Sequence, residues 1–298
     1  MLVLAPGALG DLMCLMPALE AISRRHIGAS IELMSRFELA RLAAGRTVVA
    51  RAHSIDAREL SALFSDETPV DPDACRFFAN FDRIYSFFAS EDLHFRARLA
   101  AATDAGVSFH PFLPDDDMHV SAAYLRAIEA TASPTDSRLE PTSDDLAAAA
   151  RALDQSKVDS SHLVVIFPGS GNPAKNWPAE KFAALASKLS KRASVAVILG
   201  PAEPSLEQIF RDRGVSVLKD LDLPTVAAIA RLAVAFVGND SGVSHLAAAV
   251  GTPGLAIFGL TDPARWRPLG SRIDILRRDP IDSIEVEEVA VALSKFVA

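Results

Sequence analysis

In the second half of the chain, short apolar runs alternate with longer segments of mixed polar and apolar residues. Six runs of four or five residues have the length and the Val, Ile, Leu and Phe content of buried strands. Segments with apolar positions at helical spacing, such as 179–191 and 203–213, separate several of them. Strands that alternate with helices predict an α/β fold with a doubly wound parallel sheet. The six predicted strands are 163–167, 195–199, 215–218, 233–237, 255–258 and 273–276.

The first half opens with the same alternation. An apolar run over 2–5 predicts a strand, and a glycine turn follows it. Residues 11–25 have apolar positions at helical spacing and predict a helix, which Pro17 should kink or delay. Further on the pattern weakens, and residues 36–64 predict short helical pieces around one strand. The remaining predictions are strands at 31–34, 47–50 and 83–88 and helices at 95–102 and 118–131.

A polar segment with two prolines and no periodicity, residues 133–145, is the best candidate for a linker. Its end, Thr142 to Asp145, has the residue types that begin a helix, here one over 146–155. A chain of 298 residues also favours two domains. We therefore expect domains at 1–140 and 141–298, and the last helix, 286–296, could pack on either of them.

Composition excludes several classes of protein. The net charge of −8 argues against nucleic-acid binding, although local basic groups can still hold a small anion. Two cysteines make no disulfide framework and fit a reducing compartment. The apolar start of the chain lacks a basic region and contains Gly7, Asp11 and Pro17, so we expect no signal peptide. The histidines lack metal-ligand spacing, which predicts no zinc site.

The stretch 237–263 is the most informative one for function. A predicted strand ends at Gly238, and the polar residues Asp240 and Ser241 precede a short apolar helix that carries His245. A second predicted strand, 255–258, then runs into a polar turn that contains Thr261. Taken singly, Asp240 would cap the helix and His245 would pack in the core. Together, these polar groups at adjacent strand ends favour an anion site, because parallel sheets bind ligands beyond the carboxyl ends of their strands.

Two other turns are candidates for ligand binding. Residues 168–178 contain Ser170, Gly171 and Lys175 between a strand and a helix, a composition that suits phosphate, although an ordinary loop with an exposed lysine is equally compatible. The turn Gly7-Ala8-Leu9-Gly10-Asp11 lacks the dinucleotide-binding spacing. Its simplest interpretation is a tight turn in which Asp11 caps a helix, and the functional alternative makes Asp11 a general base.

Taken together, these three stretches resemble the heptosyltransferases, glycosyltransferase family 9. The resemblance rests on Pro6 to Asp11 with Pro17-Ala18-Leu19, on Pro168 to Gly171 with Lys175 and Trp177-Pro178, and on Asp240 to Ala248 with Thr261-Asp262-Pro263. It implies a GT-B fold, in which two Rossmann-like domains with parallel sheets face a central cleft. The N-terminal domain would bind the acceptor and the C-terminal domain the nucleotide sugar.

The family resemblance also implies roles for individual residues. Asp11 would be the catalytic base, and Glu203 would face the nucleotide ribose, with Glu207 as a rival. A larger set would bind the donor phosphates, and a third set would support the motifs. The phosphate set is Ser170, Gly171, Lys175, Ser241, Gly242, Val243 and His245, and the supporting set is Gly7, Gly10, Asp240 and Thr261.

The implied reaction is an inverting, metal-independent transfer of a heptose or related sugar from an ADP-activated donor. The acceptor would be a lipopolysaccharide-type or other cell-envelope glycan or glycolipid, and no cofactor besides the donor substrate is implied. Two alternatives stay open: a nucleotide-sugar epimerase or hydrolase on the same architecture, and a non-catalytic nucleotide-sugar-binding homologue. No segment of the sequence predicts a membrane span, so we expect a cytoplasmic protein, with peripheral contact at the inner membrane surface left open.

Overall fold

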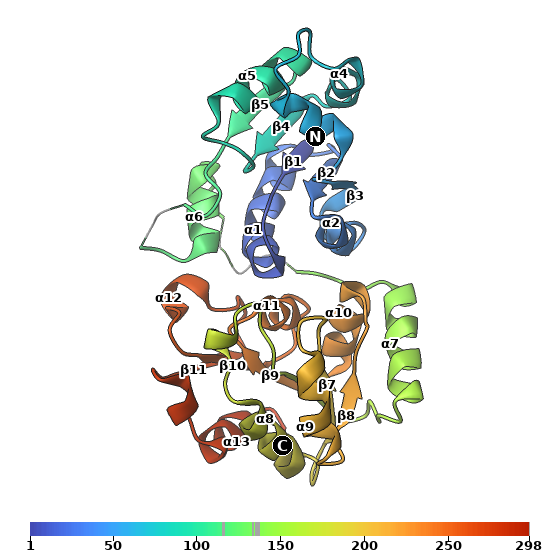
Figure 1. The fold of residues 1–298 in the computed structure, drawn as a ribbon, viewed down its shortest axis with the longest axis vertical. Coiled ribbons are helices and arrows are strands. Elements are labelled where there is room, and N and C mark those ends of the chain that lie inside the picture. Colours follow the sequence, from blue (N-terminus) through green and yellow to red (C-terminus); the bar gives the residue numbers. More distant parts are fainter. Residues whose placement is uncertain (115–116, 133, 135–137, 298) are drawn as a thin grey trace. The chain divides into compact units, whose positions relative to one another are not determined.

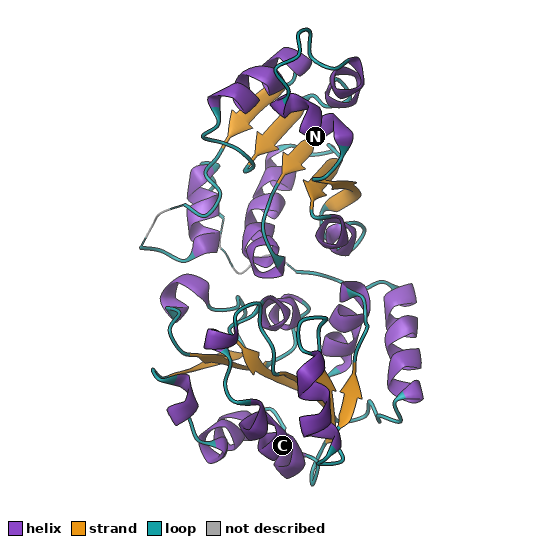
Figure 2. Ribbon diagram, in the orientation of Figure 1, coloured by secondary structure: helices purple, strands orange, loops and turns teal. Residues whose placement is uncertain are grey.

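The computed structural model describes residues 1–114, 117–132, 134 and 138–297. The chain divides into two compact units, Met1–Ser137 (unit 1) and Arg138–Ala298 (unit 2). Figure 1 shows the elements of both, and Figure 2 shows that helices flank the strands of each sheet. Residues 133 and 135–137 of the predicted linker lie outside the described part of the chain. Thr142, near its end, begins a helix as expected, since its hydroxyl accepts a hydrogen bond from the Asp145 N–H.

Unit 1 is built on a five-stranded parallel sheet in the order β3-β2-β1-β4-β5. β1 is fully buried and lies between β2 and β4, so the strand order changes direction between β1 and β4. The strands are β1 Leu2–Leu4, β2 Ile31–Ser35, β3 Val49–Ser54, β4 Arg83–Ser86 and β5 Gly106–Phe109. The helices are α1 Leu9–Arg25, α2 Phe37–Ala43, α3 Arg58–Ser61, η1 Ala62–Phe64, α4 Pro72–Phe78, α5 Leu93–Ala102 and α6 Val120–Ala127.

Unit 2 is built on a six-stranded parallel sheet in the order β11-β10-β9-β6-β7-β8. β6, β9 and β10 are buried along their whole length, which explains their continuous apolar sequences. The strands are β6 Leu163–Phe167, β7 Ser194–Ile198, β8 Ser216–Leu218, β9 Ala235–Asn239, β10 Gly254–Phe258 and β11 Ile273–Arg277. The helices are α7 Ser143–Gln155, η2 Pro173–Lys175, α8 Ala179–Leu189, η3 Pro204–Leu206, α9 Glu207–Arg211, α10 Leu223–Leu232, α11 Gly242–Ala249, α12 Pro263–Trp266, η4 Ile281–Ser283 and α13 Val286–Ser294.

The last helix, α13, packs on its own unit. It lies against α8 and β10, and its Val289 and Leu293 belong to the hydrophobic core of unit 2. Arg278 reinforces its start through two bonds of 2.9 Å to the Glu288 carboxylate. The structure thus decides between the two placements that the sequence left open.

Several predicted elements differ from those in the structure. α1 begins at Leu9 and continues through Pro17 to Arg25, so the proline does not delay the helix. The strand predicted to stop at Gly238 extends through Asn239, because both residues pair with β10. Residues 203–213 form a 3₁₀ turn and then the short helix α9 instead of one long helix. β5 and α4 were not predicted at all.

Candidate active site

The two predicted phosphate-binding stretches of unit 2 lie next to each other. β6 leads into the loop 168–178, and β9 leads into Asp240, Ser241 and α11. These two strands are paired neighbours, with Phe167 opposite Gly238 at their carboxyl ends. The chain leaves β6 toward β7 and later returns to its other side as β9, so the strand order changes direction here. Such a switch point is where open parallel sheets bind ligands.

The N-terminus of α11 provides backbone donors at this point. Ser241 is its N-cap residue, and its side chain makes no capping bond. The N–H groups of Gly242 and Val243 belong to the first turn and therefore have no acceptor within the helix. The helix dipole adds partial positive charge at the same end. An anion placed here would meet donors from Ser241, Gly242 and Val243.

Close packing fixes the position of α11 relative to β9. The buried Ser244 hydroxyl donates a 2.7 Å hydrogen bond to the Asn239 carbonyl. A Cβ added to Gly238 would lie only 2.6 Å from that hydroxyl oxygen. A residue without a side chain is therefore needed at Gly238 for the helix to approach the strand this closely.

Lys175 and Asp240 form an ion pair across the two loops. Lys175 Nζ lies 2.9 Å from Asp240 Oδ2, and the Asp240 side chain is only 6% exposed whereas that of Lys175 is 34% exposed. The carboxylate therefore does not cap α11, which corrects the simplest sequence interpretation of Asp240. An ammonium group has three N–H donors, so Lys175 can hold Asp240 and still donate to an anion.

The base of the loop 168–178 is held by the buried side chain of Asn239. Its Oδ1 accepts from the Trp177 N–H at 2.9 Å, and its Nδ2 donates to the Pro168 carbonyl at 2.7 Å. The Ser170 hydroxyl, expected to bind phosphate, instead lies 2.6 Å from Asn176 Oδ1 and 2.7 Å from the Asn172 carbonyl. Its single proton is thus used within the loop, and Gly171 at the tip is exposed.

The structure brings Glu203 to this loop and keeps Glu207 away from it. A Cβ added to Gly169 would lie 2.2 Å from the Glu203 carboxyl carbon, so the carboxylate packs directly over Gly169. Glu203 also accepts a 2.7 Å hydrogen bond from the Gly200 N–H. Glu207 binds Lys219 and Arg211 instead, and the hydrogen bond from Lys219 is the main reason why its pKa is lowered.

His245 and Thr261 complete the set of predicted residues in unit 2. His245 lies on α11, is 5% exposed, and its N–H donates to the Ser241 carbonyl at 3.3 Å. Thr261 follows β10, the strand beside β9, and is half-buried. The next residue, Asp262, caps α12 by accepting from the Ala264 N–H. All of these groups lie on segments that follow neighbouring strands.

Asp11 lies at the switch point of unit 1. It stands in the first turn of α1, the helix that follows β1, and its Oδ2 accepts a 2.8 Å hydrogen bond from the Ala8 N–H. The capping role expected of Asp11 is therefore real. Gly7 has a φ of +108°, and a Cβ there would lie 2.8 Å from the same carboxylate oxygen and 2.6 Å from the Phe112 ring. Gly10 is the second residue of α1.

Sequence reasoning missed Tyr124 on α6 as a neighbour of Asp11. The Tyr124 side chain is 1% exposed, and burial raises its pKa, with a further contribution from the Asp11 charge. The phenol is therefore protonated at neutral pH. Asn239 was missed as well, because a cap residue and a buried amide that joins two loops look the same in sequence.

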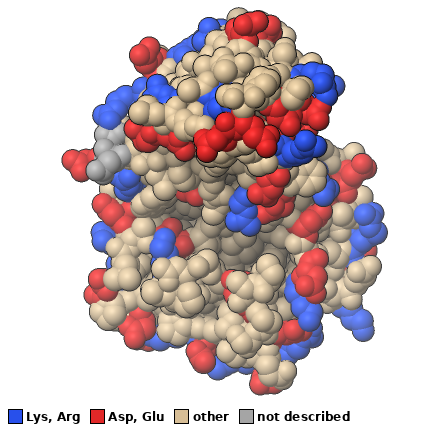
Figure 3. All heavy atoms as spheres, turned by 45° about the horizontal axis from the view of Figure 1, so that its top comes forward, with Lys and Arg blue, Asp and Glu red and all other residues tan. Residues whose placement is uncertain are grey.

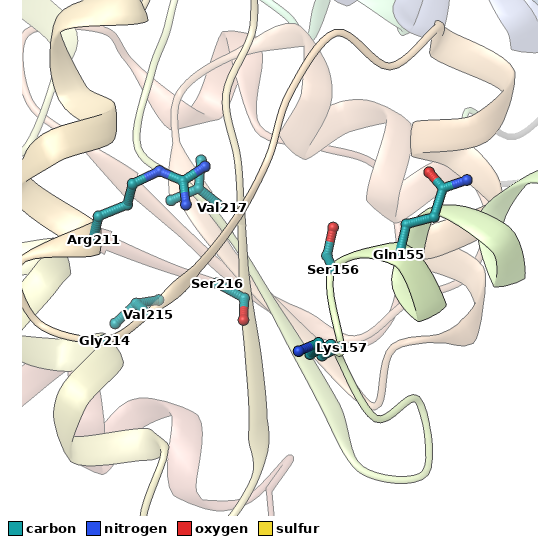
Figure 4. Close-up of a pocket in the computed structure, with 8 residues that line it drawn as sticks. All are labelled: Gln155, Ser156, Lys157, Arg211, Gly214, Val215, Ser216 and Val217. Atoms are coloured by element: carbon teal, nitrogen blue, oxygen red, sulfur yellow. The ribbon is translucent and has the colours of Figure 1, made fainter.

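A cavity of about 440 Å³ lies elsewhere in unit 2. Figure 4 shows its lining residues between the end of α7 and the start of β8, away from the carboxyl ends of the strands. The polar ends of Ser156, Lys157, Arg211 and Ser216 do not point toward a common centre (Figure 4). This arrangement does not provide a second candidate site.

Neither a cluster of metal ligands nor a membrane-spanning helix occurs among the described residues. No three His, Cys, Asp or Glu residues of the described part come together as metal ligands. None of the helices in these residues combines the length and apolar character needed to cross a bilayer. On the face drawn in Figure 3, acidic and basic side chains are interspersed, without one continuous basic patch.

Comparison with known proteins identifies the family. The model of glycosyltransferase family 9 (heptosyltransferase) matches residues 115–293, more than half of the chain. The chain belongs to this family. Lipopolysaccharide heptosyltransferase 3 of Escherichia coli K12 is 31% identical over 172 residues, which cover 54% of this chain and 50% of that protein. The chain thus spans about half the length of the curated relatives it matches.

Solved structures confirm the GT-B type of fold. A family 9 glycosyltransferase from Veillonella parvula superposes with a TM-score of 0.84 at 17% identity, covering 99% of this chain and 96% of that one. The E. coli heptosyltransferase WaaC, solved with ADP, gives a TM-score of 0.70 at 18% identity, with 99% and 100% covered. The expectation of two parallel α/β sheets with the fold of heptosyltransferases is therefore confirmed.

Proposed function

We propose that this member of the family is an inverting, metal-independent glycosyltransferase that uses an ADP-activated heptose or a related sugar. The observation that carries the proposal is the cluster at the unit 2 switch point, where Lys175 lies beside the N-terminus of α11. These groups suit a diphosphate. The ADP in the WaaC structure and the name of the E. coli relative support the nucleotide and a lipopolysaccharide-type acceptor.

The leaving diphosphate needs charge stabilisation when its bond to the sugar breaks. Lys175 would supply a positive charge, and the N–H groups of Ser241, Gly242 and Val243 would supply donors and the helix dipole. Asp240 would hold the ammonium in place, and His245 would support the phosphate side. This set of groups performs without a metal the task that a bound cation performs in other transferases.

The acceptor hydroxyl needs a base as it attacks the anomeric carbon. Asp11 would take its proton while the new C–O bond forms and the bond from carbon to the diphosphate breaks, which inverts the configuration. Unit 1 would therefore bind the glycan or glycolipid acceptor, and Glu203 in unit 2 would bind the ribose. We place the reaction in the cytoplasm, with the acceptor at the inner membrane surface.

A screen of nucleotide sugars tests the proposal. Calorimetry should show tighter binding of ADP-sugars than of UDP- and GDP-sugars, and Lys175→Ala should weaken ADP binding about tenfold or more, the loss expected for a charge-assisted phosphate contact. Lys188→Ala is the matched control, because Lys188 pairs with Glu287 on the outside of α8 and α13.

Incubation with and without acceptor separates the rival functions. A transferase releases ADP at a useful rate only when an acceptor is present. Rapid turnover of the donor alone would favour an epimerase or a hydrolase. Binding of ADP without turnover on any cell-envelope acceptor would favour a non-catalytic nucleotide-sugar-binding protein.

A further inference from the structure

Asn239 connects the two segments of the candidate donor site, the loop 168–177 and the N-terminus of α11. It is the last residue of β9 and its side chain is completely buried. Its amide makes three hydrogen bonds, all to the loop that follows β6: to the Trp177 N–H, the Pro168 carbonyl and Asn176 Oδ1, at 2.9, 2.7 and 3.3 Å. One side chain thus contacts both ends of the segment 168–177.

The main chain of Asn239 extends this connection to α11. Its carbonyl accepts the 2.7 Å hydrogen bond from the Ser244 hydroxyl in the first turn of the helix. Residue 239 therefore contacts the Lys175 loop through its side chain and the helix N-terminus through its main chain.

The loop needs such a support because its tip makes little contact with the unit. Residues Gly171, Asn172, Pro173 and Ala174 are exposed, whereas Pro168 and Trp177 at the two ends are buried. The Trp177 indole N–H donates to the Ile284 carbonyl at 3.0 Å and anchors the far end to the segment before α13. Lys175 is thus carried by an exposed segment that is fixed at its base.

We infer that Asn239 is a positioning residue for donor binding: its amide holds the 168–177 loop so that Lys175 and the N-terminus of α11 face the same anion. The inference rests on the proposed function for the identity of the ligand, and on the hydrogen bonds alone for the loop. An Ala residue at 239 would leave the buried Trp177 N–H and Pro168 carbonyl without these partners, and the loop would detach from β9 to find water.

Three variants of the full chain test the inference. Asn239→Ala removes all three side-chain bonds, and Asn176→Ala removes only the acceptor shared by Asn239 and Ser170. Thr252→Val is the matched control, since it deletes another buried hydrogen bond of unit 2, from the Thr252 hydroxyl to the Ala230 carbonyl at 2.6 Å. The measurements are amide hydrogen exchange of residues 168–177 and the dissociation constant for ADP, at a temperature where each variant is folded.

We expect Asn239→Ala to speed amide exchange in 168–177 about tenfold or more and to weaken ADP binding by a similar factor. Asn176→Ala should also speed amide exchange in 168–177 and weaken ADP binding, but by smaller factors. This variant can still decide the question if Asn239→Ala does not fold. Thr252→Val should lower the melting temperature while leaving loop exchange and ADP binding unchanged.

Unchanged exchange in 168–177 for Asn239→Ala and Asn176→Ala would overturn the inference, whatever the ligand is. Faster exchange together with wild-type ADP affinity would overturn it too, because the loop would then not serve donor binding. If Thr252→Val sped loop exchange and weakened ADP binding as much as Asn239→Ala does, the effects would reflect lower overall stability, and this result would also overturn the inference. If the wild-type protein binds no ADP, the proposed donor is wrong, and the exchange data still decide whether Asn239 holds the loop.

Discussion

Asp11 and Asp240 show how the surroundings of a carboxylate decide what it can do. Asp240 is buried, and its carboxylate forms an ion pair with the Lys175 ammonium group. Asp11 is half-buried, and its carboxylate accepts a 2.8 Å hydrogen bond from the Ala8 N–H. Of these two aspartates, Asp11 has the surroundings that suit a base, and Asp240 has those that suit the support of a cation.

Replacement of Asp11 by Asn separates its two roles. An amide oxygen can still accept the Ala8 N–H, but the side chain can no longer take a proton. Asp11→Asn should lower the transfer rate by about 10²–10⁴, the usual contribution of a general base, with the melting temperature and the ADP affinity unchanged. Asp11→Ala should lose the cap as well, at a cost of about 1 kcal/mol. Wild-type transfer by Asp11→Asn would exclude Asp11 as the base.

Two glycines of the 168–178 loop, Gly169 and Gly171, allow a controlled test of whether Glu203 binds the ribose. A methyl group at Gly169 would displace the Glu203 carboxylate, whereas one at Gly171 would meet nothing within 4 Å. Gly169→Ala should weaken ADP binding about tenfold, as expected for a lost hydrogen bond to a charged group, and leave pyrophosphate binding unchanged. Gly171→Ala should change neither, as measured by calorimetry. An equal loss for pyrophosphate would mean that the loop itself had moved.

At the scale of elements, the approach of α11 to β9 shapes the donor site. Gly238→Ala would bring a Cβ to 2.6 Å from the Ser244 hydroxyl and to 3.2 Å from the Phe167 carbonyl. Overpacking of this kind costs about 1–3 kcal/mol. We expect a lower melting temperature together with weaker ADP binding, because α11 must shift. Retention of wild-type ADP affinity would show that the anion contacts tolerate a displaced helix.

The sequence predicts the central strands of unit 2, β6, β9 and β10, well because they are buried along their whole length. An uninterrupted apolar run such as that of β6 is a strong signal. The sequence does not predict β5 because its four residues, 106–109, are all partly or fully exposed. Among the described strands, β4 alone pairs with it. The expected effect of Pro17 on α1 was too large. Pro17 is buried within a 17-residue helix, and the packing of that helix stabilises it by more than the one missing backbone hydrogen bond costs.

The candidate site was predictable in its residues and not in its contacts. Polar residue types after buried strands identified Lys175, Asp240 and the start of α11. Which of them bond to each other depends on the strand order. That order places β6 beside β9, although residues 168–234 separate the two strands in the sequence. The contacts of Asn239 with Pro168 and Trp177 follow from that pairing.

At the scale of the whole molecule, each unit has a hydrophobic core of its own. One cluster of buried apolar residues lies entirely within unit 2 and another entirely within unit 1. Both tryptophans, Trp177 and Trp266, belong to unit 2, and both tyrosines, Tyr85 and Tyr124, belong to unit 1. Tryptophan fluorescence therefore reports the unfolding of unit 2, whereas circular dichroism reports both units.

We expect two histidines, His26 and His110, to make unit 1 less stable in mild acid. Burial lowers the pKa values of His26 and His110 from 6.5. His26 bonds to the Tyr85 hydroxyl at 2.8 Å, and the His110 ring lies 2.9 Å from the Ala127 carbonyl and 3.0 Å from the Ser108 hydroxyl. Below pH 6.5 the unfolded chain takes up protons that the folded unit does not, so stability is full above that pH and falls as the pH drops through it.

Melting curves at pH 7.5 and 5.5 should show this difference between the units. The part of the circular dichroism change that tryptophan fluorescence does not report belongs to unit 1. At pH 5.5 this part should shift to lower temperature by more than the fluorescence transition does. His110→Asn replaces the ring with an amide that does not titrate, so the shift should shrink even though the variant is less stable at both pH values. An unchanged shift would assign the acid sensitivity to other groups.

Separate cores also bear on how such a protein can change over time. Under the proposed function, the residues that recognise the acceptor and those that hold the nucleotide belong to sheets that fold around different apolar clusters. A substitution that alters one specificity then does not threaten the folding of the other half. Under the same proposal, point mutations in unit 1 would change the glycan acceptor while the residues that hold the activated sugar stay unaltered.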